Sequence, residues 1–231
     1  LGNTHKVLPN GWMPLAIGVV VYYLMSVWNK GRIAMKQKLQ LGAGNEECGL
    51  FLDSVEEHFN QGKMSRVKGT AIYLAGSTKA VPMALAHNLK HNKVLHDHII
   101  IVTLKVDDGR AIVPTAERVR FDMRRPKFCR LDGHEEFPAV LSVTGVFGFR
   151  EKQDVFTVQE AAFKELGINP SGLDTTYFLS RETIVRATSG FSLDTVQEKL
   201  FEVLNRNSLS ATAYFNLPPG RVVELGMQVE L

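Results

Sequence analysis

The sequence predicts an α/β protein in which one transmembrane helix is followed by a cytoplasmic α/β domain with a partly parallel sheet. Two observations lead to this fold class. Residues 7–29 hold no charged side chain, and residues 66–106 show strand, helix and strand patterns in succession. A chain of 231 residues, of which 45% are hydrophobic, can form one sizeable domain and a smaller element.

The net charge and the two cysteines give no indication of a nucleic-acid-binding or a disulfide-rich protein. The formal net charge of +3 is small and does not by itself indicate nucleic-acid binding. Cys48 and Cys129 lie far apart and form no CxxC motif, which fits a reducing compartment rather than a disulfide framework. Because the chain begins at Leu1 rather than methionine, we expect it to be part of a longer protein.

The uncharged run VLPNGWMPLAIGVVVYYLMSVWN (residues 7–29) is predicted to span a membrane. As a helix it would be ~34 Å long, against a hydrocarbon core of about 30 Å. Trp12 and Trp28 lie near its ends, where aromatic rings favour the lipid–water interface. A signal peptide is a weaker alternative, because the basic residues follow the run instead of preceding it. A buried helix of a soluble protein also stays open.

The charges beside this run predict its orientation. Only Lys6 precedes it, and the basic residues that follow are Lys30, Arg32, Lys36 and Lys38. The positive-inside rule therefore places the C-terminal side in the cytoplasm. Residues 31–41 are expected to continue as a basic amphipathic helix, and the Gly-rich stretch 41–49 indicates a linker. We divide the chain accordingly into residues 1–41, the membrane helix and its exit, and residues 42–231, the α/β domain.

The α/β domain begins with a strand–helix–strand pattern. A strand is predicted within RVKGTAIYLAG (66–76), a helix from Pro82 to about His91, and a second strand in HIIIVTLKV (98–106). The near-continuous apolar run of the second strand is typical of a strand that is covered on both faces of a parallel sheet. The other predicted elements are strands at 117–123, 139–149 and 175–180, helices at 157–166 and 194–207, and a closing strand within 220–231.

The stretch HNLKHNKVLHDH (87–98) contains four histidines. His87 and His91 share a helix face, a spacing that two zinc ligands can use, but the glutamate of an HExxH site is absent and Lys90 lies between them. A metal site, a pH-responsive surface and a structural role all stay open. We favour helix capping and packing and expect no metal site. The same question applies to His96 and His98.

The turn after the first strand is a candidate phosphate site, because a helix N-terminus that follows a turn favours an anion. Residues 118–130 hold six Lys or Arg side chains against one Asp, which suits a phosphate-bearing ligand or anionic lipid headgroups. The candidate nucleotide-binding residues are Gly76, Ser77, Thr78, Arg118 and Arg120. Neither GxxxxGK[ST] nor GxGxxG is present, and an ordinary turn and a solvated face are the commoner explanations.

No pattern for catalysis stands out. The sequence shows no Ser/His/Asp order, no paired-carboxylate pattern and no cofactor fingerprint. We therefore expect no catalytic residue, no cofactor and no enzyme activity. An anchored hydrolase has no motif in its favour.

Four stretches together resemble the C-terminal part of bacterial Kup potassium uptake transporters, of the Kup/HAK/KT family. GTAIYLAGSTKAVPMALAHNLKHNKVLHDHIIIVTL (69–104) resembles the start of the family's cytoplasmic C-terminal domain. YFLSRETI (177–184) and RNSLSATAYFNLPPGRVVELGMQVEL (206–231) resemble later segments of that domain. GWMPLAIGVVVYYLMSVWNKGR (11–32) resembles the last membrane span. The resemblance covers nearly the whole chain, although Arg150 stands where members often have methionine.

The resemblance implies proton-coupled potassium uptake by a multi-pass protein of the bacterial inner membrane. The family's ion pathway lies in earlier spans, so the ion-binding residues are expected outside this chain, and the α/β domain is expected to regulate transport or support assembly. The implied partners are potassium ion, protons and the lipid bilayer, with no nucleic acid. A regulatory nucleotide and a homo-oligomer stay open. The alternative interpretation is a membrane-anchored nucleotide-sensing module.

Overall fold

The structure is a computed structural model that describes residues 12–42, 48–77, 80–125, 138–169, 174–185 and 195–230. The chain divides into two compact units. One comprises Leu1–Gly42, Thr183–Ser208 and Gln228–Leu231, and the other comprises Ala43–Glu182 and Leu209–Met227. The predicted domain boundary at residues 41 and 42 remains a prediction.

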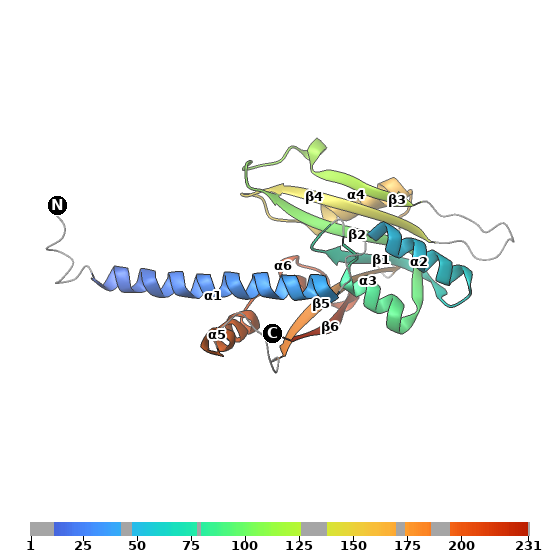
Figure 1. Cartoon of the computed structure of the whole chain (residues 1–231). Coiled ribbons are helices and arrows are strands. Elements are labelled where there is room, and N and C mark those ends of the chain that lie inside the picture. The colour runs from blue at the N-terminus through green and yellow to red at the C-terminus, as the bar shows by residue number, and fades with distance from the viewer. Residues whose placement is uncertain are drawn as a thin grey trace. The chain divides into compact units, whose positions relative to one another are not determined.

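The first unit is built around α1 (Trp12–Gly42), a single helix of 31 residues (Figure 1). The predicted span and the predicted basic exit are therefore continuous within the described residues, and residues 7–11 of the predicted span lie outside them. Helix α5 (Thr195–Arg206) packs on α1 in this unit. Of the predicted linker at residues 41–49, the first two residues belong to α1 and the last two to the next helix, and residues 43–47 lie outside the described residues.

A six-stranded sheet has the strand order β3-β4-β2-β1-β5-β6 (Figure 1). The strands are β1 (Ser65–Ala75), β2 (Val94–Asp107), β3 (Val119–Arg125), β4 (Ala139–Gly148), β5 (Thr175–Val185) and β6 (Val222–Glu230). Strand β1 pairs in parallel with β2 and β5, and β2 pairs in parallel with β4. Strand β3 is antiparallel to β4, so the prediction of a partly parallel sheet is confirmed.

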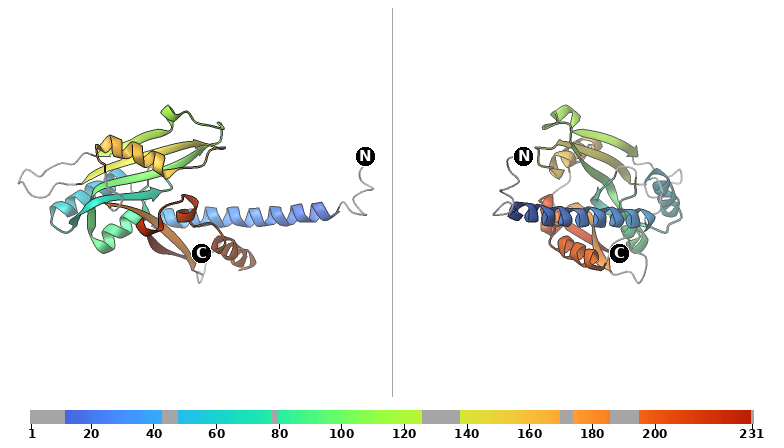
Figure 2. Two further views of the ribbon diagram at one scale, coloured as in Figure 1. Left: turned by 180° about the vertical axis from the view of Figure 1, so that it is seen from behind. Right: turned by 60° about the vertical axis from the view of Figure 1, so that its left-hand side comes forward.

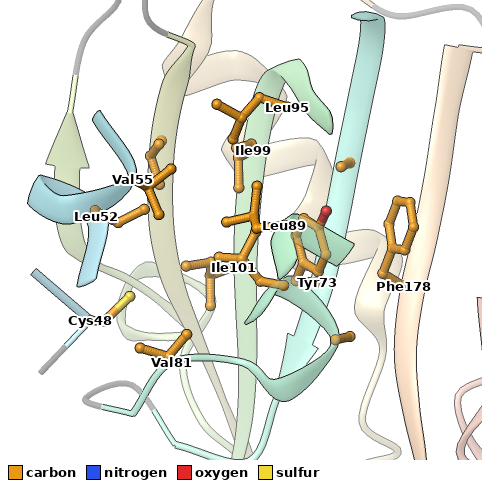
Figure 3. Close-up of a cluster of buried hydrophobic side chains, with 14 of the residues drawn as sticks. Cys48, Leu52, Val55, Tyr73, Val81, Leu89, Leu95, Ile99, Ile101 and Phe178 are labelled. Atoms are coloured by element: carbon orange, nitrogen blue, oxygen red, sulfur yellow. The ribbon is translucent and has the colours of Figure 1, made fainter. Parts of the chain in front are cut away.

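Helices cover both faces of the central strands. On one face lie α2 (Cys48–Asn60), α3 (Met83–His87) and a π-helical turn (Asn88–Asn92), and on the other lies α4 (Val155–Leu166). Alternate residues of β2 enter the two cores: Ile99 and Ile101 pack under α2 and α3 (Figure 3), whereas Ile100 packs under α4. This burial on both sides explains the continuous apolar run of β2.

Local chemistry defines the ends of α4. The Asp154 carboxylate caps its start by accepting hydrogen bonds from the backbone N–H groups of Phe156 and Thr157, each at 3.1 Å. Gly167 ends it with a left-handed backbone at φ 64°, which glycine adopts without a steric penalty. Gly145 of β4 lets the helix approach closely, because a Cβ there would overlap the side chain of Val158.

Each predicted helix and strand of the α/β domain is confirmed, with ends shifted by a few residues. Helix α2 was missed, although its buried residues follow a helical spacing that was available in the sequence: Cys48, Leu52, Val55 and Phe59. Three short elements were also missed: α6 (Ala211–Tyr214) and the 3₁₀ turns Thr115–Glu117 and Pro219–Arg221.

Candidate functional site

The histidine-rich stretch is organised by an asparagine. Asn88 opens the π-helical turn after α3 and is only 3% exposed. Its Nδ2 donates hydrogen bonds to the Tyr73 hydroxyl at 3.1 Å and to the carbonyl of Val94 at 3.2 Å. Its Oδ1 accepts one from Nδ2 of Asn92 at 2.8 Å. One buried amide therefore joins the helix end to both β1 and the start of β2.

Tyr73 is the partner of this amide in the core. Its side chain is 1% exposed and stacks on Phe178 of β5, with ring centroids 4.8 Å apart (Figure 3). Burial raises the pKa of the Tyr73 hydroxyl, and the hydrogen bond from Asn88 opposes this only in part. The phenol is therefore neutral at physiological pH and acts as a hydrogen-bonding group rather than as a base.

The turn ends in a left-handed residue. Lys93 has φ 55°, and its backbone N–H donates to the carbonyl of Leu89 at 3.2 Å. A left-handed backbone is uncommon for a residue other than glycine. Residues 87–93 therefore combine a π turn, a buried amide network and a left-handed end, and π turns within helices occur frequently at functional sites.

His87 and His91 lie on one face of this helical run, as predicted, with ring centroids 5.6 Å apart. Partial burial lowers the pKa of His87, and the nearby positive charges of His91 and Lys90 lower it further. Within the described residues no three His, Cys, Asp or Glu side chains gather as a metal site would require. The expectation that zinc is not a ligand remains a prediction.

His96 of β2 is partly buried and lies near Phe178 of β5. The imidazole ring of His96 and the phenyl ring of Phe178 form a T-shaped contact, with their centroids 5.5 Å apart. The Nδ1 atom of His96 is buried and has no hydrogen-bond partner among the described residues. Burial lowers the pKa of His96, and the charge of Asp97 opposes that effect. His98 is partly buried further along β2.

The structure does not bring the predicted nucleotide-binding residues together. Gly76 and Ser77 are exposed after the end of β1, Thr78 lies outside the described residues, and α3 begins only at Met83. The sheet register aligns Ala75 with Thr103, Thr103 with Thr144, and Thr144 with Arg120. Arg120 is thus three strand spacings from the end of β1, ~14 Å. A ligand that contacts both would have to reach across β2 and β4.

Most of the described arginines in the basic segment are paired with carboxylates. Arg118 forms an ion pair with Glu151, and Arg124 and Arg125 form ion pairs with Glu165 at 3.2 Å and with Asp53 at 2.7 Å. Arg120 is exposed on the edge strand β3, and Lys127 and Arg130 lie outside the described residues. These ion pairs offset much of the positive charge on which the phosphate prediction rests.

Glu151 also forms hydrogen bonds with the backbone near Arg118. Its Oε2 accepts hydrogen bonds from the backbone N–H groups of Gly148 at 2.8 Å and Val113 at 2.9 Å. These two hydrogen bonds, together with the charge of Arg118, lower the pKa of Glu151. Arg118 therefore has a structural partner within the fold, which makes it a weaker candidate for a ligand than the sequence indicated.

Helix α1 carries an exposed apolar surface. Residues Trp12–Gln37 form a helix that is long and apolar enough to cross a membrane. Only 6% of its most apolar 18-residue stretch is buried. The exposed large side chains on it are Trp12, Met13, Leu15, Ile17, Val19, Val20, Val21, Tyr22, Tyr23, Met25 and Ile33. A helix that exposes apolar side chains over most of its circumference fits a lipid environment rather than water.

Sequence reasoning missed Tyr73, Asn88 and Asn92. Asn88 and Asn92 are four residues apart, as are His87 and His91. The spacing that places the histidines on one helix face therefore also predicts that the two asparagines are neighbours. Nothing in the sequence indicated that Tyr73 would receive the amide, because that contact depends on how α3 crosses β1.

Comparisons with known proteins identify relatives over the whole chain. The family described as K+ potassium transporter C-terminal domain matches residues 68–231. The low affinity potassium transport system protein Kup of Pectobacterium atrosepticum is 34% identical over 231 residues, 100% of this chain and 34% of that protein. Kup 2 of Chromobacterium violaceum, named a probable potassium transport system protein, is 38% identical over 229 residues, 99% of this chain and 34% of its own length. The probable Kup protein of Myxococcus xanthus is 38% identical over 229 residues, 99% of this chain and 32% of its own length.

The chain spans about a third of the length of these curated relatives. The names of all three relatives describe potassium transport. No solved structure matches the chain.

Proposed function

Because the chain belongs to the potassium transporter C-terminal domain family, we propose that it is the last membrane span and the cytoplasmic domain of a potassium uptake transporter. The observation that carries this proposal is the order of its parts. An exposed apolar helix, Trp12–Gln37, lies on the N-terminal side of the residues that match the family, 68–231. The order is consistent with a transporter whose final span leads into a C-terminal domain.

We place the α/β domain in the cytoplasm of a bacterial cell and the span in the inner membrane. The support is the charge asymmetry, since Lys30, Arg32 and Lys36 are exposed on α1 after its apolar part and only Lys6 precedes it in the sequence. Transport moves an ion without making or breaking a covalent bond, so the proposal assigns no enzyme activity and no cofactor.

The proposal extends to proton-coupled symport and to a regulatory or assembly role for the α/β domain. The apolar part of α1 contains no acidic residue that could carry a proton or coordinate potassium. The ion-binding residues would therefore come from the earlier part of the parent protein. The α/β domain would act on transport through α1, the helix from which it follows in the chain.

A chimeric transporter tests the proposal. The matched C-terminal third of the Chromobacterium violaceum relative is replaced by this chain and expressed in a strain that cannot take up potassium. We expect growth at low potassium and uptake of rubidium, a potassium analogue, because the two segments are 38% identical over 229 residues. Addition of a protonophore should abolish this uptake.

The matched controls are the intact relative and the relative truncated before its last span. The proposal fails if the truncated relative takes up rubidium as fast as the intact one, since the segment would then have no role in transport. It also fails if the chimera reaches the membrane in normal amounts and stays inactive.

A nucleotide-sensing module is the alternative function. Its support is the exposed turn at Gly76 and Ser77 and the exposed Arg120. The separation of these residues across β2 and β4 makes it the weaker proposal, and calorimetry with a panel of nucleotides tests whether the chain binds such a ligand.

A further inference from the structure

Helix α5 docks on α1 through one aromatic side chain. Phe201 is 1% exposed and packs against Val27 and Met35 of α1, with the ring of Trp28 at 5.6 Å between centroids. A Cβ on Gly31 would overlap the Phe201 ring, so this glycine forms the notch that receives it. Both views of Figure 2 show α5 beside α1.

The rest of the apolar face of α5 is uncovered. Val196, Leu200 and Val203 have the spacing of one helix face, yet Val196 is 70% exposed and Val203 is 55% exposed. Lys199 lies four residues before Val203 and Arg206 three residues after it, so both basic side chains border this face. An apolar stripe with basic residues at its border is typical of a helix that lies in a membrane interface.

The docking point lies where α1 changes from apolar to basic. Trp28 stands at this boundary, and the guanidinium of Arg32 lies over its ring, 5.8 Å from the centroid. Lys30 and Lys36 are exposed in the same two turns of α1. If α1 spans a bilayer, this level is that of the lipid headgroups, where tryptophan and basic side chains are favoured. The helix that carries this exposed apolar face therefore packs on α1 at this level, through Phe201 and Leu200.

We propose that α5 is an interfacial helix that binds the surface of a bilayer containing anionic lipid, with Phe201 in the Gly31 notch holding it at headgroup depth. Val196 and Val203 enter the apolar edge of the bilayer, and the exposed side chains of Lys30, Lys36 and Lys199 contact lipid phosphates. This inference rests on the proposed function, because it requires α1 to span the membrane.

Site-specific fluorescence on the full chain tests the proposal. An NBD label is placed at Val203→Cys in a background of Cys48→Ala and Cys129→Ala, and the protein is reconstituted into vesicles of phosphatidylcholine with or without phosphatidylglycerol. We expect a blue-shifted emission and quenching by lipids that carry a nitroxide near the headgroup. The matched control is Asn205→Cys, about 200° around the same helix, which should stay unquenched.

Variants of the two glycines on α1 test the notch. Gly31→Val should abolish the quenching of the Val203→Cys label, because the new side chain displaces Phe201. Gly18→Val is the control, since nothing lies within 4 Å of a Cβ at Gly18, and it should leave the quenching unchanged. Persistence of the signal in the Gly31→Val protein would refute the role of the notch.

A third label position separates this proposal from the proposed function. A label at Val20→Cys should be quenched by nitroxides deep in the acyl chains if α1 spans the bilayer. Quenching at Val20→Cys with none at Val203→Cys refutes the interfacial helix alone. Absence of quenching at Val20→Cys refutes the membrane span itself. Equal quenching of the Val203→Cys label with and without phosphatidylglycerol refutes the preference for anionic lipid.

Discussion

Asn88 donates a hydrogen bond to the hydroxyl of Tyr73 at 3.1 Å, and this contact joins the π turn after α3 to the central strand β1. Both side chains are almost fully buried, at 3% and 1% exposure. A buried amide that lost its partners would retain the cost of its desolvation, so the three hydrogen bonds of Asn88 make the turn dependent on a single residue. The rings of His87 and His91, on either side of Asn88, instead lie near each other, with centroids 5.6 Å apart.

Replacement of Asn88 by alanine should therefore destabilise the α/β domain by about 2–3 kcal/mol, because the buried Tyr73 hydroxyl and the partly buried Val94 carbonyl lose their donor. Urea unfolding of the chain in detergent micelles, followed by far-UV circular dichroism, measures the change. Tyr73→Phe should cost about 1 kcal/mol, and His91→Ala, on the exposed side of the turn, less than about 0.5 kcal/mol. An Asn88→Ala protein as stable as the parent would contradict this account.

Stability should decrease in mild acid. The folded chain lowers the pKa of His87 and His96 below the ordinary value of 6.5, so the unfolded chain binds protons more readily than the folded one. Their contribution is complete above pH 6.5 and is lost as the pH falls from there through the folded pKa values. The variant His87→Gln/His96→Gln should flatten the dependence of the unfolding free energy on pH in this window.

The orientation of the span predicts a protease pattern. Protease added to right-side-out membrane vesicles should leave residues 42–231 intact, because the positive-inside rule predicts a cytoplasmic location for the side that follows the basic residues of α1. Inside-out vesicles are the control and should lose the domain. Cleavage of the domain in right-side-out vesicles would show that the orientation is reversed.

The chain by itself should move no potassium. A single helix cannot enclose a path or replace the hydration shell of the ion, and the apolar part of α1 offers no acidic side chain. Expression of residues 1–231 in a strain deficient in potassium uptake should not restore growth at low potassium, whereas the chimera described above should. Rescue by this chain alone would overturn the assignment of the ion pathway to other spans.

If the α/β domain binds a small ligand, a nucleotide is expected in preference to zinc. The exposed Gly76–Ser77 turn and Arg120 offer groups for phosphate, whereas His87 and His91 have Lys90 between them and no evident third ligand within the described residues. Calorimetry of the chain in nanodiscs, first with a panel of nucleotides and then with zinc, gives the answer. Micromolar zinc binding that disappears in the His91→Ala variant, without any nucleotide signal, would reverse this ranking.

The pattern of apolar and polar residues along the sequence was sufficient to predict an element wherever the burial of its own side chains determines that element. The apolar run of β2, the alternation in β3 and the uncharged stretch of α1 each predict one element, because each element buries or exposes its own side chains in a regular repeat. Helix α2 has the same kind of signal at Cys48, Leu52, Val55 and Phe59, and its omission was an error of interpretation. The Gly-rich residues before it drew attention to a linker instead.

The candidate site required the tertiary structure. The predicted partners Ser77 and Arg120 are separated by two strands, because strand order in a sheet depends on crossover connections that no local repeat encodes. The same applies to Arg125, which forms an ion pair with Asp53 of α2. The sequence alone determined the class of the protein, an apolar helix long enough to cross a membrane followed by an α/β domain of a transporter family. The tertiary structure decided that Asn88 joins the turn to Tyr73 and that Gly31 receives Phe201, because both contacts depend on how separate elements pack against each other.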